Sequence, residues 1–238
     1  MPERPYVFVN MAMTADGKID TAERRGARIS GAADSARVAR LRADADAIMV
    51  GGRTLINEDP RLTVRDPDLV ARRTAAGRAA QPMKVGVVSR LTGGDVDHLL
   101  QSGAFLHEGA AAVTVCTSTR SEPAVIARLR HEGAEVIVAG DARVDLAVAL
   151  HALRDRGVER LMVEGGSTLV ASLLAAGLVD ELQLAVAPLI FGGESAPTPV
   201  GGPGWNRADA LALHLVETAT SPDGDVVLRY LLAPEVLR

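Results

Sequence analysis

The sequence predicts an α/β fold with a mostly parallel central sheet that is flanked by helices. Short runs rich in β-branched residues alternate with segments in which apolar residues recur at helical spacing. Strands that alternate with helices in this way pair in parallel, and the helices cover both faces of the sheet. Two successive strands near the end of the chain, joined by "TSPDGD", predict an antiparallel C-terminal hairpin.

The individual strands follow from short apolar runs that end at glycine, proline or polar residues. We expect them at 6–13, 47–51, 84–89, 111–117, 135–139, 160–164, 180–188, 212–219 and 225–232. The helices follow from the apolar spacing, as at Leu146, Leu150 and Leu153, where Gly157 then ends the helix. We expect helices at 30–45, 122–133, 144–157 and 167–177, and a short helical turn from Thr54. The polar segment 65–82 is expected to be a surface loop.

Composition and length set the broad class of protein. The chain has 238 residues, 47% of them hydrophobic, which fits a single globular domain over 1–238. A net charge of −4 argues against nucleic acid as a partner. The single cysteine, Cys116, lies in an apolar run, so we expect it to be buried and expect no internal disulfide. Neither a signal peptide nor a membrane-spanning run is visible, so a cytoplasmic protein is expected.

Two glycine pairs lie where an expected strand ends and a helix or helical turn begins. Gly165-Gly166 follows Glu164, and Gly51-Gly52 follows the apolar run 47–50. Ligands bind at the carboxyl ends of strands in α/β sheets, and the N–H groups that begin a helix attract an anion. The two turns together therefore favour a site for a phosphorylated cofactor over the alternative of two ordinary structural turns.

Charged residues near these turns offer candidate contacts for a phosphate. Arg37, Arg40 and Arg42 do not share one face of the expected helix, so most of them are expected to be solvated. Arg42 and Arg65 could still converge to clamp a phosphate. Lys18 follows a tight turn and would usually lie at the surface.

Several kinds of chemistry find no support in the sequence. The five histidines show no metal-ligand spacing, and no serine, threonine or cysteine stands in a triad-like context. Neither a GxGxxG nor a Walker motif occurs. The sequence therefore predicts no metal site and no familiar dinucleotide or nucleotide loop.

The chain nevertheless resembles the riboflavin-biosynthesis reductase family, whose fold is like that of dihydrofolate reductase. The matching segments are "MTADGKI", "RISG…LRADADAIMVGGRTLINEDPRLTVR", "LMVEGGSTLVASLLAAGLVDELQLAVAPLIFGG" and "APTPVGGPGW", in the expected order over about 5–232. The resemblance implies reduction of the ribose of a ribosylaminopyrimidine 5′-phosphate to a ribityl chain, with NADPH as the cofactor. The local sequence most resembles the archaeal and fungal type, whose substrate is the diamino-pyrimidinone; the deaminated uracil analogue and a bacterial source stay open. The chain has neither H-x-E nor P-C-x-x-C, so we expect a reductase without the zinc deaminase that often accompanies it.

The same resemblance implies roles for particular residues. NADPH would be bound by Ala12, Arg28, Thr54, Glu58, Ser89, Gly165, Gly166, Ser167, Thr168 and Leu169. The substrate would be contacted by Arg42, Leu62, Arg65 and Glu164. Lys18 and Asp16 would lie near the ribose as catalytic candidates. Two positions depart from the family pattern, because Glu58 replaces the usual Asp and Arg28 replaces the aromatic residue of many bacterial relatives.

Two other functions stay open at this point. One is a dihydrofolate or pterin reductase on the same fold, because fold does not fix substrate. The other is a non-catalytic nucleotide-binding protein, although such a protein would be free to lose Arg65 and Glu164. The apolar strands within 212–232 further suggest an exposed edge that a homodimer would cover.

Overall fold

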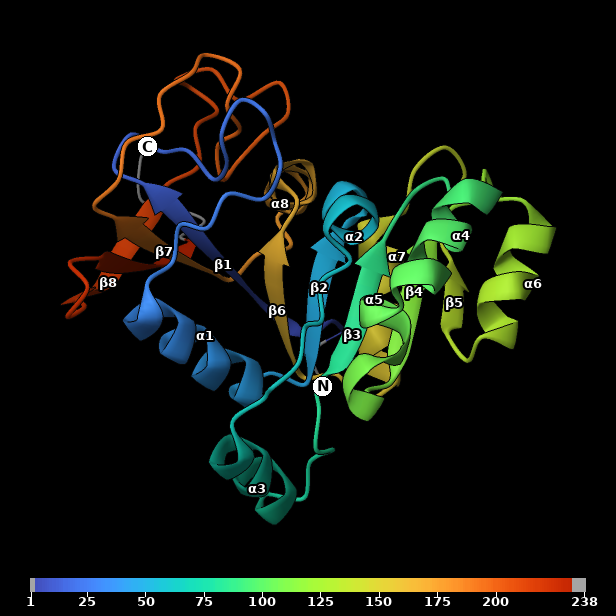
Figure 1. Cartoon of the computed structure of the whole chain (residues 1–238). Coiled ribbons are helices and arrows are strands. Elements are labelled where there is room, and N and C mark those ends of the chain that lie inside the picture. Colours follow the sequence, from blue (N-terminus) through green and yellow to red (C-terminus); the bar gives the residue numbers. More distant parts are fainter. Residues whose placement is uncertain (1–2, 233–238) are drawn as a thin grey trace. The chain divides into compact units, whose positions relative to one another are not determined.

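The computed structural model describes residues 3–232 (Figure 1). The chain divides into two compact units. The first contains residues 1–6 and 39–162, and the second contains residues 7–38 and 163–238. The prediction of one domain over 1–238 stays a prediction, and its two ends, 1–2 and 233–238, lie outside the described residues.

The first unit has a parallel sheet in the order β5-β4-β3-β2. These strands are β2 (Ala47–Gly51), β3 (Met83–Val87), β4 (Val113–Thr117) and β5 (Glu135–Val138). Its helices are α2 (Gly52–Glu58), α3 (Pro67–Ala75), α4 (Gly93–Ser102), α5 (Ala104–His107), the 3₁₀ turn η1 (Glu108–Ala110), α6 (Pro123–His131) and α7 (Leu146–Asp155). Because the strands are parallel, their carboxyl ends share one edge, and α2 begins directly at that edge (Figure 1).

The second unit carries the antiparallel part of the fold. Its strands run in the order β1-β7-β9-β8, with β1 parallel to β7 and the other neighbours antiparallel. They are β1 (Tyr6–Thr14), β7 (Glu181–Ala187), β8 (Leu213–Thr220) and β9 (Val226–Leu232), and α8 (Ser167–Ala175) belongs with them. Three elements cross between the units: β1, between Tyr6 and Val7, α1 (Ala32–Asp44), between Val38 and Ala39, and β6 (Arg160–Gly165), between Met162 and Val163. The α/β fold with a mostly parallel sheet and a C-terminal hairpin is confirmed.

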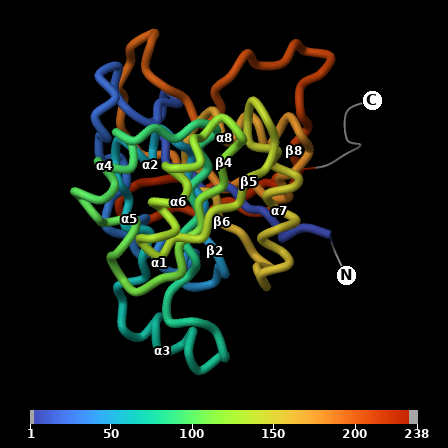
Figure 2. The backbone as a smooth tube through the Cα atoms, turned by 90° about the vertical axis from the view of Figure 1, so that its right-hand side faces the viewer, coloured from blue at the N-terminus to red at the C-terminus, as the bar shows by residue number. Residues whose placement is uncertain are grey.

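The prediction of a loop over 65–82 was wrong, because α3 occupies Pro67–Ala75. The helix starts where helices prefer to start: Asp66 caps the N–H groups of Asp68 and Leu69, and Pro67 stands in the first turn. In both views α3 lies at the periphery of its unit, which explains why it lacks an apolar stripe (Figures 1 and 2). Arg73 anchors it instead, since its buried guanidinium donates to the carbonyls of Ala43, Ala45 and Ala79.

Arg37 also departs from the prediction that most of the α1 arginines are solvated. Only 17% of its side chain is exposed, and the guanidinium donates to Asp34, Asn10 and Gln183 at 2.8–3.0 Å. Asn10 and Gln183 are register partners on β1 and β7, so Arg37 ties α1 to both strands. Arg40 is exposed, as expected.

Two further observations bear on the expectations from composition. Cys116 on β4 is fully buried, as expected, and burial raises the pKa of its thiol to about 12. Within residues 3–232, no helix is both long and apolar enough to cross a membrane.

Candidate active site

The glycine turn after β6 has a backbone that only glycine adopts easily. Gly166 caps α8 with φ 87° and ψ 90°, and it supplies no side chain to the N–H groups of the first turn. Gly201 packs against this turn, because its N–H donates to the carbonyl of Ser167 at 3.1 Å and a Cβ there would lie 3.0 Å from Ser167 Oγ. The "VEGGST" and "PVGGPGW" segments therefore meet at the start of α8, where an anion would find unsatisfied donors.

The other residues that the resemblance assigns in the second unit are placed as follows. Glu164, the residue before the glycine pair, is half-buried on β6, and Leu169 is buried in α8. Thr168 is exposed and Ala12 is half-buried on β1. Arg28 is exposed, and its Nε donates to the carbonyl of Ser30 at 3.2 Å.

The turn that follows β1 is tied together by Thr14 and Asp16. Thr14 donates its hydroxyl to Asp16 and accepts the N–H of Lys18 at 2.9 Å. The Asp16 carboxylate also accepts the N–H of Gly192 at 2.7 Å and of Phe191 at 3.3 Å. The Thr14 hydroxyl and these two N–H groups hold the pKa of Asp16 below its usual value. Asp16 therefore braces the turn that carries the half-buried Lys18.

In the first unit, the loop 59–65 between α2 and α3 carries two predicted substrate contacts. Leu62 is buried with φ 48°, and Arg65 is exposed. Arg42 reaches the same loop, since its Nη1 donates to the carbonyl of Thr63 at 3.2 Å. The structure therefore places both predicted phosphate-binding arginines, Arg42 and Arg65, at this loop.

The predicted cofactor contacts of the first unit lie at the carboxyl ends of β2 and β3. The helix α2 begins at Gly52 rather than at Thr54, and it ends at the exposed Glu58. A Cβ on Gly52 would lie 3.3 Å from the carbonyl oxygen of Val87, so this glycine permits close packing on β3. Ser89 follows β3 and accepts the N–H of Val144 at 3.1 Å. That the two glycine turns hold one ligand stays a prediction.

Sequence reasoning missed the residues that hold the loop 59–65 in place. The side-chain amide of Gln81 pairs with both backbone groups of Val64, at 2.8 and 2.9 Å, as a neighbouring strand would. Glu108 forms ion pairs with Arg61 at 2.7 Å and with Arg65 at 3.5 Å. No local pattern marks these residues, because each acts on a segment far away in the sequence.

Within residues 3–232, no group of three or more histidine, cysteine or acidic side chains could hold a metal ion.

In α/β folds of this kind, ligands bind at the carboxyl ends of the strands, where the glycine turn before α8 lies. Residues 5–227 match the RibD C-terminal domain. A 2,5-diamino-6-ribosylamino-4(3H)-pyrimidinone 5′-phosphate reductase of Methanothermobacter thermautotrophicus is 42% identical over 228 residues, covering 95% of this chain and 98% of that protein. A protein of the same name from Archaeoglobus fulgidus is 41% identical over 84% of this chain and 87% of its own length.

The fold is also found among solved structures. A pyrimidine reductase-like protein of Corynebacterium diphtheriae superposes with a TM-score of 0.80 over 97% of this chain and 93% of its own, at 23% identity. The chain belongs to the RibD C-terminal domain family. The resemblance to the riboflavin-biosynthesis reductases is thereby confirmed.

Proposed function

We propose that the chain reduces the ribose of 2,5-diamino-6-ribosylamino-4(3H)-pyrimidinone 5′-phosphate to a ribityl chain, using NADPH. The observation that carries this proposal is the 42% identity, over nearly the full length of both chains, to an archaeal protein of that name. NADPH oxidation that depends on this pyrimidine is the direct test. Deaminated and dihydrofolate substrates in the same assay distinguish the other reductase activities.

The glycine turn fits the phosphate-bearing cofactor on structural grounds. Gly166 leaves the first N–H groups of α8 without a side-chain cap, and its φ of 87° lets the backbone approach a ligand closely. Ser167, Thr168 and Leu169 would line this turn, and Thr54, Glu58, Ser89, Ala12 and Arg28 would complete the binding of NADPH. Arg28 and the hydroxyl groups of Thr54, Ser167 and Thr168 would favour NADPH over NADH, since the extra phosphate adds charge and acceptors for them to bind.

The remaining residues would bind and protonate the substrate. Glu164 accepts from the ring N–H and amino groups of the pyrimidine, a task that suits a carboxylate. Arg65 and Arg42 hold the 5′-phosphate beside Leu62. The bound NADPH would supply the hydride that C1′ of the ribose receives. Lys18 donates a proton to the ribose oxygen, Asp16 braces the turn that carries Lys18, and the protein contributes mainly the orientation of two bound molecules.

Gly166→Ala tests the cofactor turn. A Cβ at φ 87° strains the backbone and blocks close approach, so the Kd for NADPH should rise at least about tenfold, which corresponds to about 1.4 kcal/mol. Gly177→Ala is the matched control, because Gly177 has φ 66° and open space at the other end of α8. Titration calorimetry on both variants, with unfolding curves to separate strain from binding, measures the difference. Normal NADPH binding by folded Gly166→Ala would make the turn merely structural.

Arg65→Ala tests the phosphate contact. A guanidinium–phosphate pair is charge-assisted, so the variant should lose about tenfold or more in kcat/KM for the phosphorylated substrate. It should barely change kcat/KM for the same compound without its phosphate. Arg65→Lys should recover only part of the loss, since an ammonium lacks the planar fork. Arg72→Ala on α3, where the arginine pairs with Asp44 at 2.7 Å, is the control. Equal losses on both substrates would assign Arg65 a structural or cofactor-directed role.

We also propose a homodimer and a cytoplasmic location. Every residue of β8 is exposed, and the edge carries the exposed apolar side chains of Leu211, Leu213, Leu215 and Val216. An exposed edge strand of this kind pairs readily with another chain, and a second copy would cover it. The buried, unpaired Cys116 thiol is in keeping with a reducing compartment. Sedimentation of the purified protein measures the oligomeric state.

A further inference from the structure

The loop 59–65 is held in place by the segment 103–110, which forms α5 and η1 and which we call the brace. No sequence motif marks this segment. The carboxylate of Asp59 accepts the N–H groups of Ala104 and Phe105, at 2.8 and 2.9 Å, and so caps the start of α5. Asp59 is itself buried and has φ 41°. The first residue of the loop is thus fixed to the first turn of the brace.

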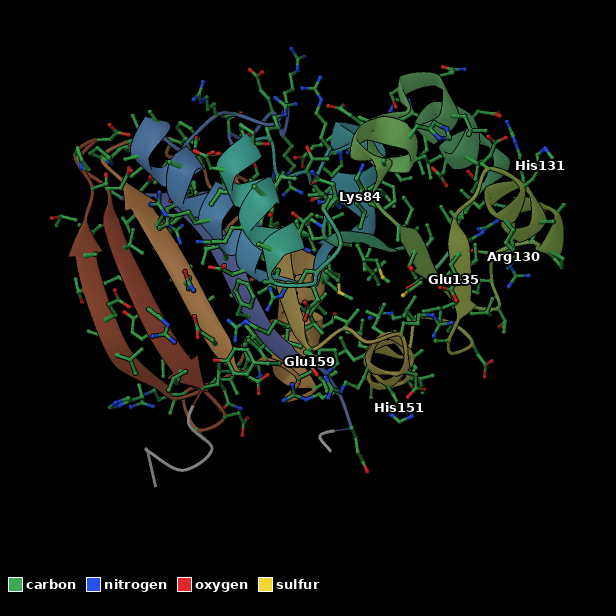
Figure 3. The ribbon with its side chains drawn as sticks, turned by 90° about the horizontal axis from the view of Figure 1, so that it is seen from below. Lys84, Arg130, His131, Glu135, His151 and Glu159 are labelled. Atoms are coloured by element: carbon green, nitrogen blue, oxygen red, sulfur yellow. The ribbon has the colours of Figure 1, made fainter. Side chains whose placement is uncertain are left out.

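Lys84 on β3 connects the start of this segment to Glu108. Its side chain is fully buried, and its Nζ donates to the carbonyls of Ala104 and Phe105 at 3.0 Å and of Glu108 at 2.6 Å (Figure 3 labels Lys84). Burial lowers the pKa of Lys84 to about 8, so the amine still carries its proton at pH 7 and has three N–H groups for three acceptors. Its donation to Glu108 fixes the backbone of that residue to the sheet.

The brace also touches the middle of the loop. Gly109 has φ 86°, and a Cβ there would lie 2.5 Å from Cγ2 of Thr63. Only glycine lets the two segments approach this closely. Backbone and packing contacts therefore hold the loop and the brace together independently of the Glu108 side chain.

On this fixed backbone, the Glu108 carboxylate faces two arginines of the loop. It lies 2.7 Å from Nε of Arg61 and 3.5 Å from Nη2 of Arg65. Between 41% and 63% of each of the three side chains is exposed, so an ion pair alone would add little stability. What the carboxylate restricts is the direction of two long, flexible side chains.

We propose that Glu108 is a positioning residue that aligns Arg65, and that Arg61 is a second arginine for the 5′-phosphate. This inference rests on the proposed function, in which Arg65 binds that phosphate. One carboxylate against two guanidinium groups leaves a net positive charge for a dianion. Glu108 engages one nitrogen of each arginine, and the remaining N–H groups of each five-donor fork are then aligned for the phosphate oxygens.

Glu108→Gln removes the charge but keeps the carbonyl that Lys84 holds. KM for the phosphorylated substrate should rise about three- to fivefold, within the range of an exposed ion pair, while kcat stays unchanged. KM for the same compound without its phosphate should not change. Glu108→Asp should recover part of the loss because it restores the charge. Asp97→Asn, which breaks the exposed pair between Asp97 and Arg128 at 2.6 Å, is the matched control and should leave both substrates unaffected.

The mechanism of action is tested by combining variants. If Glu108 acts through these two arginines, Glu108→Gln should cause no further loss in a protein that already carries both Arg61→Ala and Arg65→Ala. Arg61→Ala should raise KM for the phosphorylated substrate alone. The inference is overturned if Glu108→Gln leaves KM for the phosphorylated substrate unchanged or lowered, or changes KM equally for both substrates. That result is decisive when Arg65→Ala in the same assay weakens only the phosphorylated substrate. If Arg65→Ala does not discriminate it, the assignment of Arg65 fails, and this inference fails with it.

Discussion

Glu164→Gln is expected to lower kcat/KM for the pyrimidine substrate about 100-fold or more. The change keeps the shape of the side chain but replaces an acceptor with a donor, which in the proposed complex would face the N–H and amino groups of the pyrimidine. A mismatched polar pair in a half-buried position costs about 1–3 kcal/mol, and the mismatch persists in the transition state. The Kd for NADPH should change little. Steady-state kinetics and cofactor titration of the same preparation measure both effects.

Glu159→Gln is the matched control, because Glu159 stands just before the other end of β6 and its exposed side chain pairs with Arg154 at 3.3 Å. It removes the same charge from the protein and should leave kcat/KM within about twofold. If Glu164→Gln instead loses NADPH and keeps its affinity for the pyrimidine, Glu164 belongs to the cofactor contacts.

Arg37→Met should destabilise the protein by about 3–5 kcal/mol. The substitution leaves Asp34, whose side chain is 1% exposed, as a buried charge without its guanidinium partner. It also removes the donors that Asn10 and Gln183 accept on β1 and β7. Chemical denaturation should show a lower midpoint at an unchanged m-value.

Arg40→Met is the control on the same helix, because Arg40 is exposed and its loss should cost less than about 0.5 kcal/mol. The double variant Arg37→Met/Asp34→Asn should lose less stability than the sum of the single variants, since removing both charges leaves neither one unpaired. A loss below about 1 kcal/mol in Arg37→Met would show that the Arg37 contacts are solvated and weak.

The elements with strong periodicity were predictable from the sequence, and those set by isolated contacts were not. The apolar stripe Leu146, Leu150 and Leu153 predicted a helix, and α7 spans Leu146–Asp155. The helix α3 was missed because it lies at the periphery and is anchored by Arg73 rather than by an apolar face. The helix α4 did carry a local signal that was overlooked, since Thr92 and Asp95 form a capping box.

Individual residues likewise differ in whether a local sequence signal could reveal their role. Gly166 was recognisable, because glycine between a strand and a helix is a local signal, and its φ of 87° explains the need for it. Arg37 was misjudged because helical spacing does not show which polar groups on other strands will receive its N–H groups. Glu108 gave no signal at all, since its partners Arg61 and Arg65 lie more than forty residues earlier and are brought to it only by the fold.

The most direct test of the proposed function is NADPH oxidation by the purified protein with three substrates side by side. These are 2,5-diamino-6-ribosylamino-4(3H)-pyrimidinone 5′-phosphate, its deaminated uracil analogue and dihydrofolate, each also assayed with NADH. The account predicts the highest kcat/KM for the diamino compound with NADPH, formation of the ribityl product, and a lower kcat/KM with NADH. Oxidation only with dihydrofolate, or tight NADPH binding with no turnover of either pyrimidine, would contradict it.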